Sequence, residues 1–316
     1  MEFIREYQLL YKLVIVDGIG KCGKSLFANI LSSFNTVEKQ DYNDFIEYIA
    51  LAHKYNKISP DIAVAILKTQ MDCALYNNMV GRQINTRVTD NSSLYNYHTP
   101  SKYIERSVGM EGSDIATKVL EEKPIYLTWS HDLINKSDVI FESFGSGLEF
   151  FYINRRPIDI IYEWSLKNYS ERMSKDATEM QYCIKYKDTS VPVIALGWEE
   201  EFLTCKPLER TIRLIHSCFR LNLQELIKKQ HYKNLHIINF EDLVTNPQIT
   251  IEKLKNIIGI EPLPLLKKLL LKENVPRLLN EQEYQERKAT IANNTSGNYS
   301  DLLILMDQMY QQIREL

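Results

Sequence analysis

The stretch KLVIVDGIGKCGKSLFANIL, Lys12 to Leu31, decides the fold. Its apolar run from Leu13 to Val16 is typical of a buried parallel strand, and apolar residues at helical spacing follow the glycines. The loop between them matches the pattern G-x-x-x-x-G-K-[ST] at Gly18, Gly23, Lys24 and Ser25. Glycines let backbone N–H groups turn inward, and a helix start adds partial positive charge. This order of strand, loop and helix therefore predicts a phosphate-binding loop.

Composition narrows the class of protein. The chain has 316 residues, enough for a full α/β core, and a net charge of −3 that favours neither nucleic acid nor an acidic membrane surface as a partner. Its five cysteines are scattered without a CxxC pair, so they indicate neither a disulfide framework nor a zinc site. The sequence contains neither a signal-peptide pattern at its start nor an apolar run of the ~20 residues that span a membrane. We expect a reduced, soluble, cytoplasmic protein without a bound metal.

Strand patterns alternate with helical ones along the chain. Further strands are expected in KPIYLTWSHD, from Leu148 to Asn154, and in NLHIINFEDL. The pattern predicts an α/β fold in which a parallel sheet is flanked by helices, with the active residues at the carboxyl ends of the strands. We expect residues 1–316 to form a single domain. The polar, tyrosine-rich segments 86–114 and 165–210 are expected to be insertions on the acceptor side.

A second stretch, FFYINRRPIDIIYEW, places two arginines directly after a predicted strand. Arg155 and Arg156 fall at the strand's carboxyl end, and Pro157 suits the first turn of a helix. Guanidinium groups there can grip a phosphate with two hydrogen bonds, although two solvated surface arginines are the alternative. A second phosphate site near the first implies a ligand with two separated phosphates.

These residues resemble the motifs of sulfotransferases that use 3′-phosphoadenosine-5′-phosphosulfate. Arg155, Pro157 and Asp159 resemble the family's 3′-phosphate-binding segment. The family's loop, K-x-G-T/S-T/S, is matched by Lys21, Gly23, Lys24 and Ser25, with a lysine where the family often has a hydroxyl residue. PIYLTWSHDL is similar to the strand end that carries the family's histidine, here His131, and LHIINFEDLVTNPQITIEKLKNIIGI resembles a later segment. The resemblance covers most of the chain in matching order.

The resemblance implies transfer of a sulfuryl group from 3′-phosphoadenosine-5′-phosphosulfate to a hydroxyl of a carbohydrate or another polar acceptor, a small molecule or a glycan. Lys21 would stabilise the negative charge that develops on the leaving oxygen, and His131 would remove the proton of the acceptor hydroxyl. The 5′-phosphate would be held by the loop residues Gly20, Lys21, Cys22, Gly23, Lys24 and Ser25. Arg155, helped by Arg156, would hold the 3′-phosphate.

One residue departs from the family pattern. Glu163 stands eight residues after Arg155, where the family usually has a serine that contacts the 3′-phosphate. Two alternatives stay open. The first, favoured by the complete Gly-Lys-Ser loop, is a kinase that places Ser25 on Mg²⁺ and takes a second carboxylate from Glu241 or Asp242. The second is a nucleotide-binding relative that has lost catalysis. The acceptor and the oligomeric state are left open by the sequence.

Overall fold

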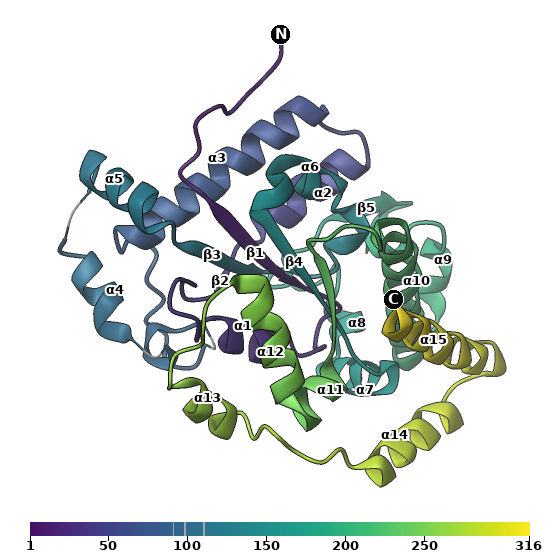
Figure 1. The fold of residues 1–316 in the computed structure, drawn as a ribbon. Coiled ribbons are helices and arrows are strands. Elements are labelled where there is room, and N and C mark those ends of the chain that lie inside the picture. Colours follow the sequence, from purple (N-terminus) through teal and green to yellow (C-terminus); the bar gives the residue numbers. More distant parts are fainter. Residues whose placement is uncertain (91, 98, 110) are drawn as a thin grey trace.

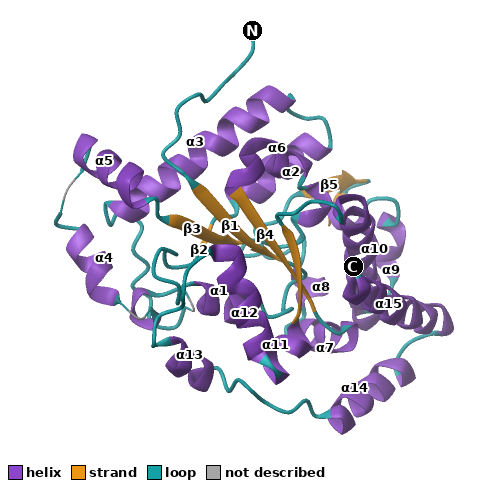
Figure 2. Cartoon of the chain, viewed as in Figure 1, coloured by secondary structure: helices purple, strands orange, loops and turns teal. Residues whose placement is uncertain are grey.

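A five-stranded parallel sheet forms the centre of the protein. The structure, a computed structural model, describes residues 1–90, 92–97, 99–109 and 111–316. The sheet has the strand order β2-β3-β1-β4-β7, and every neighbouring pair is parallel. Its strands are β1 (Lys12–Asp17), β2 (Asp41–Tyr42), β3 (Ile125–Trp129), β4 (Leu148–Asn154) and β7 (Leu235–Asn239). Figures 1 and 2 show the sheet in the middle of the molecule with helices around it. The predicted fold class is confirmed.

Helices cover both faces of the sheet because the central strands are apolar on both sides. Leu13 to Val16 of β1 are fully buried. Successive side chains of a strand point to opposite faces. On β4, Phe151 packs against Phe27 of α1 (Lys24–Leu31), with ring centroids 5.3 Å apart, whereas Phe150 stacks on Phe141 of α6 (Asp138–Phe144) at 5.5 Å. The first helix and the sixth therefore lie on opposite faces.

The other helices follow the alternation that the sequence predicted, with one short strand added. The segment between the first helix and the first insertion contains α2 (Phe45–Lys54) and α3 (Pro60–Met79), and it opens with β2, which is only two residues long. A strand of that length has no periodicity that a sequence could display. The remaining long helices are α5 (Ser113–Glu122), α7 (Pro157–Leu166), α10 (Pro207–Lys229), α12 (Pro247–Ile258), α14 (Glu281–Asn293) and α15 (Gly297–Glu315).

The two predicted insertions hold mainly short elements. The first contains α4 (Pro100–Arg106), and its residues 91, 98 and 110 lie outside the described residues. The second contains α8 (Tyr169–Arg172), α9 (Glu199–Thr204) and an antiparallel hairpin of β5 (Cys183–Tyr186) and β6 (Thr189–Pro192), which the sequence did not indicate. The short helices α11 (Phe240–Thr245) and α13 (Leu266–Lys272) complete the fold. The single-domain organisation stays a prediction.

Within the described part of the chain, no helix combines the length and apolar character needed to cross a membrane.

Candidate active site

The carboxyl ends of β1, β3 and β4 meet at one large cavity. Because β1 lies between the other two, the segments that follow these three strands are neighbours. The cavity has a volume of about 1220 Å³ and is lined by Lys21, Lys24, His131 and Arg155, among others. Three motifs that are far apart in the sequence therefore contribute to the same site.

The glycine-rich loop leads into α1 through a glycine with a positive φ angle. Gly23 has φ 106° and caps α1, whose first N–H groups have no acceptor within the helix. A Cβ atom on Gly23 would stand 2.3 Å from the Phe240 ring, so glycine is required there on both steric and conformational grounds. The buried Lys24 ammonium donates to the carbonyl oxygens of Gly18 at 2.7 Å and Ile19 at 3.1 Å, so its charge lies inside the loop.

Of the predicted loop residues, Gly20, Lys21, Gly23, Lys24 and Ser25 line the cavity. Cys22 is instead buried beneath the loop, where burial raises the pKa of its thiol to about 11, and its N–H donates to the carbonyl of Ile19. Lys21 is exposed at the tip, with φ 72° and its ammonium 5.9 Å from the centre of the Tyr169 ring. The loop is also anchored from α7, because the indole N–H of Trp164 donates to the Gly20 carbonyl at 2.9 Å.

Arg155 points into the cavity and is stacked on an aromatic ring. Its guanidinium carbon lies 4.6 Å from the centre of the Phe240 ring, and Nη1 donates to the Lys21 carbonyl at 2.6 Å. Its buried Nε has no hydrogen-bond acceptor among the described residues. A buried N–H without an acceptor is costly, so this atom marks a place where an anion would be stabilised.

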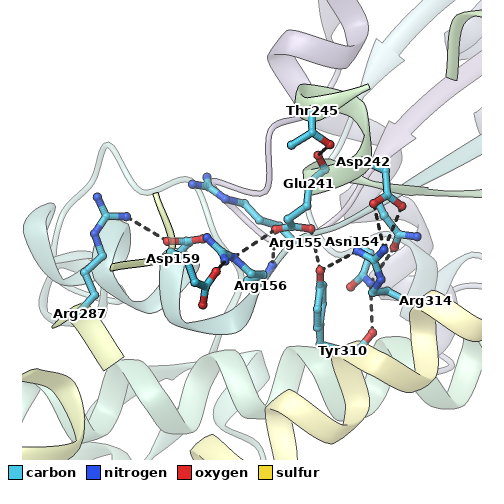
Figure 3. A network of polar contacts seen from close by, with 12 residues as sticks. Asn154, Arg155, Arg156, Asp159, Glu241, Asp242, Thr245, Arg287, Tyr310 and Arg314 are labelled. Carbon is cyan, nitrogen blue, oxygen red and sulfur yellow. Dashed lines mark hydrogen bonds and ion pairs between the residues drawn. The ribbon is translucent and has the colours of Figure 1, made fainter. Parts of the chain in front are cut away.

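Arg156 lies in a different environment, within a network of charged groups (Figure 3). Its Nε donates to Asp159 at 3.1 Å, its Nη1 to Glu281 at 3.0 Å, and its main-chain N–H to Glu241 at 3.0 Å. Its guanidinium also stacks on Tyr284 at 3.8 Å and is not among the groups that line the cavity. The two arginines are therefore not brought together on one phosphate site, and a phosphate contact from Arg156 stays a prediction.

His131 has a carboxylate beside it that the sequence did not indicate. Glu47 of α2 accepts the main-chain N–H of His131 at 2.8 Å through Oε1, and the same oxygen lies 3.5 Å from the imidazole Nδ1. The imidazole is 40% exposed and meets the Trp129 ring edge to face at 5.3 Å. This arrangement fixes the ring and lets Glu47 stabilise an imidazolium, which suits a general base.

Glu163 also lines the cavity. No described residue forms a hydrogen bond or an ion pair with its carboxylate, and Arg155 and Arg156 are both directed elsewhere. Ser165 does not replace the family serine, because its hydroxyl donates to the Ile161 carbonyl of its own helix at 2.8 Å. Glu163, which stands where the family pattern has a serine, therefore adds an unpaired negative charge to the site.

The two candidate carboxylates of an Mg²⁺-dependent kinase, and Asp17 at the end of β1, already have protein partners. Asp17 is buried and accepts from Ser130, Leu133 and Ile134 at 2.8 to 3.0 Å. Glu241 accepts from the Tyr310 hydroxyl at 2.8 Å, and Asp242 accepts from Nη2 of Arg314 through both of its carboxylate oxygens (Figure 3). The described residues contain no group of three or more His, Cys, Asp or Glu side chains placed to hold a metal ion.

Comparison with known proteins finds similarity among solved structures. No protein-family model and no curated protein matches the chain. A sulfotransferase domain from the curacin biosynthetic pathway is 12% identical, with 97% of each chain covered and a TM-score of 0.49. A sulfotransferase domain from the Synechococcus olefin synthase is 10% identical, covering 100% of this chain and 98% of its own, with a TM-score of 0.44. Retinol dehydratase, in complex with androsterone and the inactive cofactor PAP, is 12% identical, with 98% of this chain and 81% of its own chain covered and a TM-score of 0.36. Each of these three TM-scores lies below 0.5.

Proposed function

We propose that the protein is a sulfotransferase that moves a sulfuryl group from 3′-phosphoadenosine-5′-phosphosulfate to a hydroxyl of a carbohydrate or another polar acceptor. The observation that carries this proposal is one cavity lined by a phosphate loop, by Arg155 and by a histidine with a carboxylate partner. The loop and Arg155 suit a nucleotide with two separated phosphates. His131 lines the same cavity, which supports its assignment as the base for the acceptor hydroxyl.

The reaction can be assigned to these residues step by step. The acceptor oxygen attacks sulfur while its proton passes to His131, and Glu47 stabilises the imidazolium that forms. The bond between sulfur and the bridging oxygen breaks, and that oxygen remains on the 5′-phosphate of adenosine 3′,5′-bisphosphate. Lys21 at the loop tip and the N–H groups at the start of α1 meet its growing negative charge. Arg155 orients the donor through the 3′-phosphate.

The fit of the donor rests on Arg155 and is opposed by Glu163. The Nε of Arg155 is buried without an acceptor in the described part of the chain, which favours an anion there. The unpaired carboxylate of Glu163 in the same cavity weakens such binding. A kinase is less well supported, because its candidate carboxylates Glu241 and Asp242 are held by protein donors. Loss of catalysis would leave nucleotide binding intact and abolish turnover.

Calorimetric titration of the protein with three ligands tests the proposal. They are adenosine 3′,5′-bisphosphate, 5′-AMP, and ATP with Mg²⁺. We expect the bisphosphate to bind at least tenfold more tightly than 5′-AMP, because the 3′-phosphate adds charge-assisted hydrogen bonds from Arg155. Arg155→Ala should remove that difference. Arg172→Ala should keep it, since Arg172 lines the same cavity but is paired with Asp176 and Glu179.

A second measurement tests catalysis itself. Release of adenosine 3′,5′-bisphosphate from the phosphosulfate donor should depend on an added hydroxyl acceptor. Binding of the bisphosphate without release in an acceptor panel of sugars and phenols would favour the inactive relative. Preference for ATP with Mg²⁺ over the bisphosphate would favour the kinase.

A further inference from the structure

We infer that the acceptor carries an anionic group, a carboxylate or a phosphate, at the end remote from the hydroxyl that is sulfated. This rests on the proposed function, since it describes the acceptor of that reaction. It concerns three cavity-lining cations that the proposed reaction does not use, Lys54, Lys136 and Arg220, which come from three different elements.

None of these three cations is paired with a carboxylate in the described part of the chain. The Lys54 ammonium donates to the amide oxygen of Asn135 at 3.2 Å, which is a neutral partner. Lys136 donates to the backbone carbonyls of His131 at 3.3 Å and Asp132 at 2.7 Å. Arg220 is exposed and has neither a hydrogen bond nor an ion pair with any described residue.

The charges around Lys54 are predominantly positive. Lys54 is exposed as a residue, but partial loss of contact with water is the largest cause that lowers its pKa. Repulsion from Lys136 and, more weakly, from Arg220 adds to this shift, while Glu225 and Asp138 oppose it. Those two carboxylates are already neutralised, because both pair with Lys228 and Lys229. In a chain whose net charge is −3, this end of the cavity holds like charges that an anion would stabilise.

Helix α2 gives the distance between the hydroxyl and the anion. Glu47, which holds His131, and Lys54 both line the cavity from this helix, seven residues apart. At a rise of 1.5 Å per residue their Cα atoms are about 10 Å apart along the axis. Tyr48 and Leu51 line the wall between them, and the Tyr48 ring stacks on Tyr182 at 4.9 Å. The acceptor therefore has a hydroxyl, an apolar body and an anionic end, in that order.

Most of the other carboxylates that line the cavity have partners of their own. Glu47 faces His131, and Glu179 is paired with Arg172. Asp132 accepts the side-chain amide of Asn222 at 2.9 Å. Asp90 lies 3.6 Å from Nε of Arg87, whereas Glu163 has no partner among the described residues and belongs to the proposed donor site. Lys54 and Arg220 therefore stay able to bind an incoming anion.

Equilibrium binding of three matched ligands tests this inference independently of turnover. They are 4-(4-hydroxyphenyl)butanoate, its neutral amide, and 3-(4-hydroxyphenyl)propyl phosphate, titrated calorimetrically with adenosine 3′,5′-bisphosphate present and absent. We expect the better of the two anions to bind at least tenfold more tightly than the amide, because two charge-assisted contacts are gained. Whichever anion is preferred identifies the end group as carboxylate or phosphate.

Two variants connect the preference to the proposed residues. Lys54→Gln and Arg220→Gln should each reduce it several-fold, and the double variant should bind anion and amide equally. Lys233→Gln removes the same charge from an exposed lysine that does not line the cavity and should leave the preference unchanged. Both test positions are exposed, so the variants should keep the thermal stability of the parent protein.

The inference is overturned if the parent protein binds none of the three ligands, or binds anion and amide equally. It is also overturned if the preference survives in the double variant. These results differ from a failure of the proposed function, which would appear as weak binding of adenosine 3′,5′-bisphosphate. An anion preference that persists without the nucleotide would support the acceptor site even then.

Discussion

Replacing Glu47 tests whether the histidine acts as a base supported by a carboxylate. Glu47→Gln keeps an oxygen that can accept the main-chain N–H of His131 but removes the negative charge 3.5 Å from Nδ1. At that separation the attraction to an imidazolium is about 1 kcal/mol in water and about 5 kcal/mol at an effective dielectric constant of ~20. Because the imidazole is 40% exposed, the smaller value applies. We therefore expect kcat to fall by roughly five- to tenfold.

The assay compares two acceptors under saturating donor. An aliphatic alcohol must lose its proton during the transfer, whereas an acidic phenol is already largely ionised at neutral pH. With the alcohol, His131→Ala should lower kcat by about 10² or more, which is typical for loss of a general base. With the acidic phenol, both His131→Ala and Glu47→Gln should have little effect. Glu179→Gln, which removes another carboxylate of the cavity wall, is the matched control.

The double variant distinguishes a positioning role from an independent one. If Glu47 acts through His131, adding Glu47→Gln to His131→Ala should cause no further loss. Losses that multiply in the double variant would refute the reasoning. So would a drop in kcat that is equally large for the ionised phenol, since no proton remains to be removed there.

Three further changes should have measurable effects. Glu163→Ser removes a negative charge that would repel the phosphates of the donor. It should tighten the binding of adenosine 3′,5′-bisphosphate about tenfold in calorimetry and leave the binding of 5′-AMP unchanged. Tighter binding of both ligands would show that Glu163 does not face the 3′-phosphate. Gly23→Ala forces a side chain into a left-handed backbone and onto Phe240, so we expect about 2 kcal/mol or more of lost stability in urea unfolding and loss of nucleotide binding. Burial alone would raise the pKa of Glu38, but the hydrogen bonds and charge of Arg106 and its neighbours hold it at about 2. Stability from this group is complete above the unfolded pKa of 4.5 and is lost as the pH falls toward 2, on the order of 3 kcal/mol in all. Urea midpoints measured from pH 6 to 2.5 should show this loss, and in Glu38→Gln the midpoint should depend less on pH.

The features that the sequence predicted are those encoded locally. The strand, loop and helix from Lys12 to Leu31 are contiguous, and the strand before Arg155 has the predicted bounds, Leu148 to Asn154. Glu47 and Phe240 could not be predicted, because each reaches the site from an element remote in the chain and only the folded sheet brings it to His131 or Arg155. Periodicity assigns a residue to a helix face but does not say which other element that face meets.

The two adjacent arginines show that a sequence motif does not tell which of its side chains reaches the site. Their sequence pattern is one motif, yet only Arg155 reaches the cavity, because Arg156 caps α7 and is held by Asp159, Glu241 and Glu281. These contacts join the ends of β4 and β7 to α14, and Glu241 in turn accepts the Tyr310 hydroxyl of α15 (Figure 3). The backbone of Arg155 is thereby fixed before any ligand arrives, which lowers the entropic cost of gripping a phosphate. Arg156 thus supports the predicted donor site through the position of its neighbour, even without touching the donor.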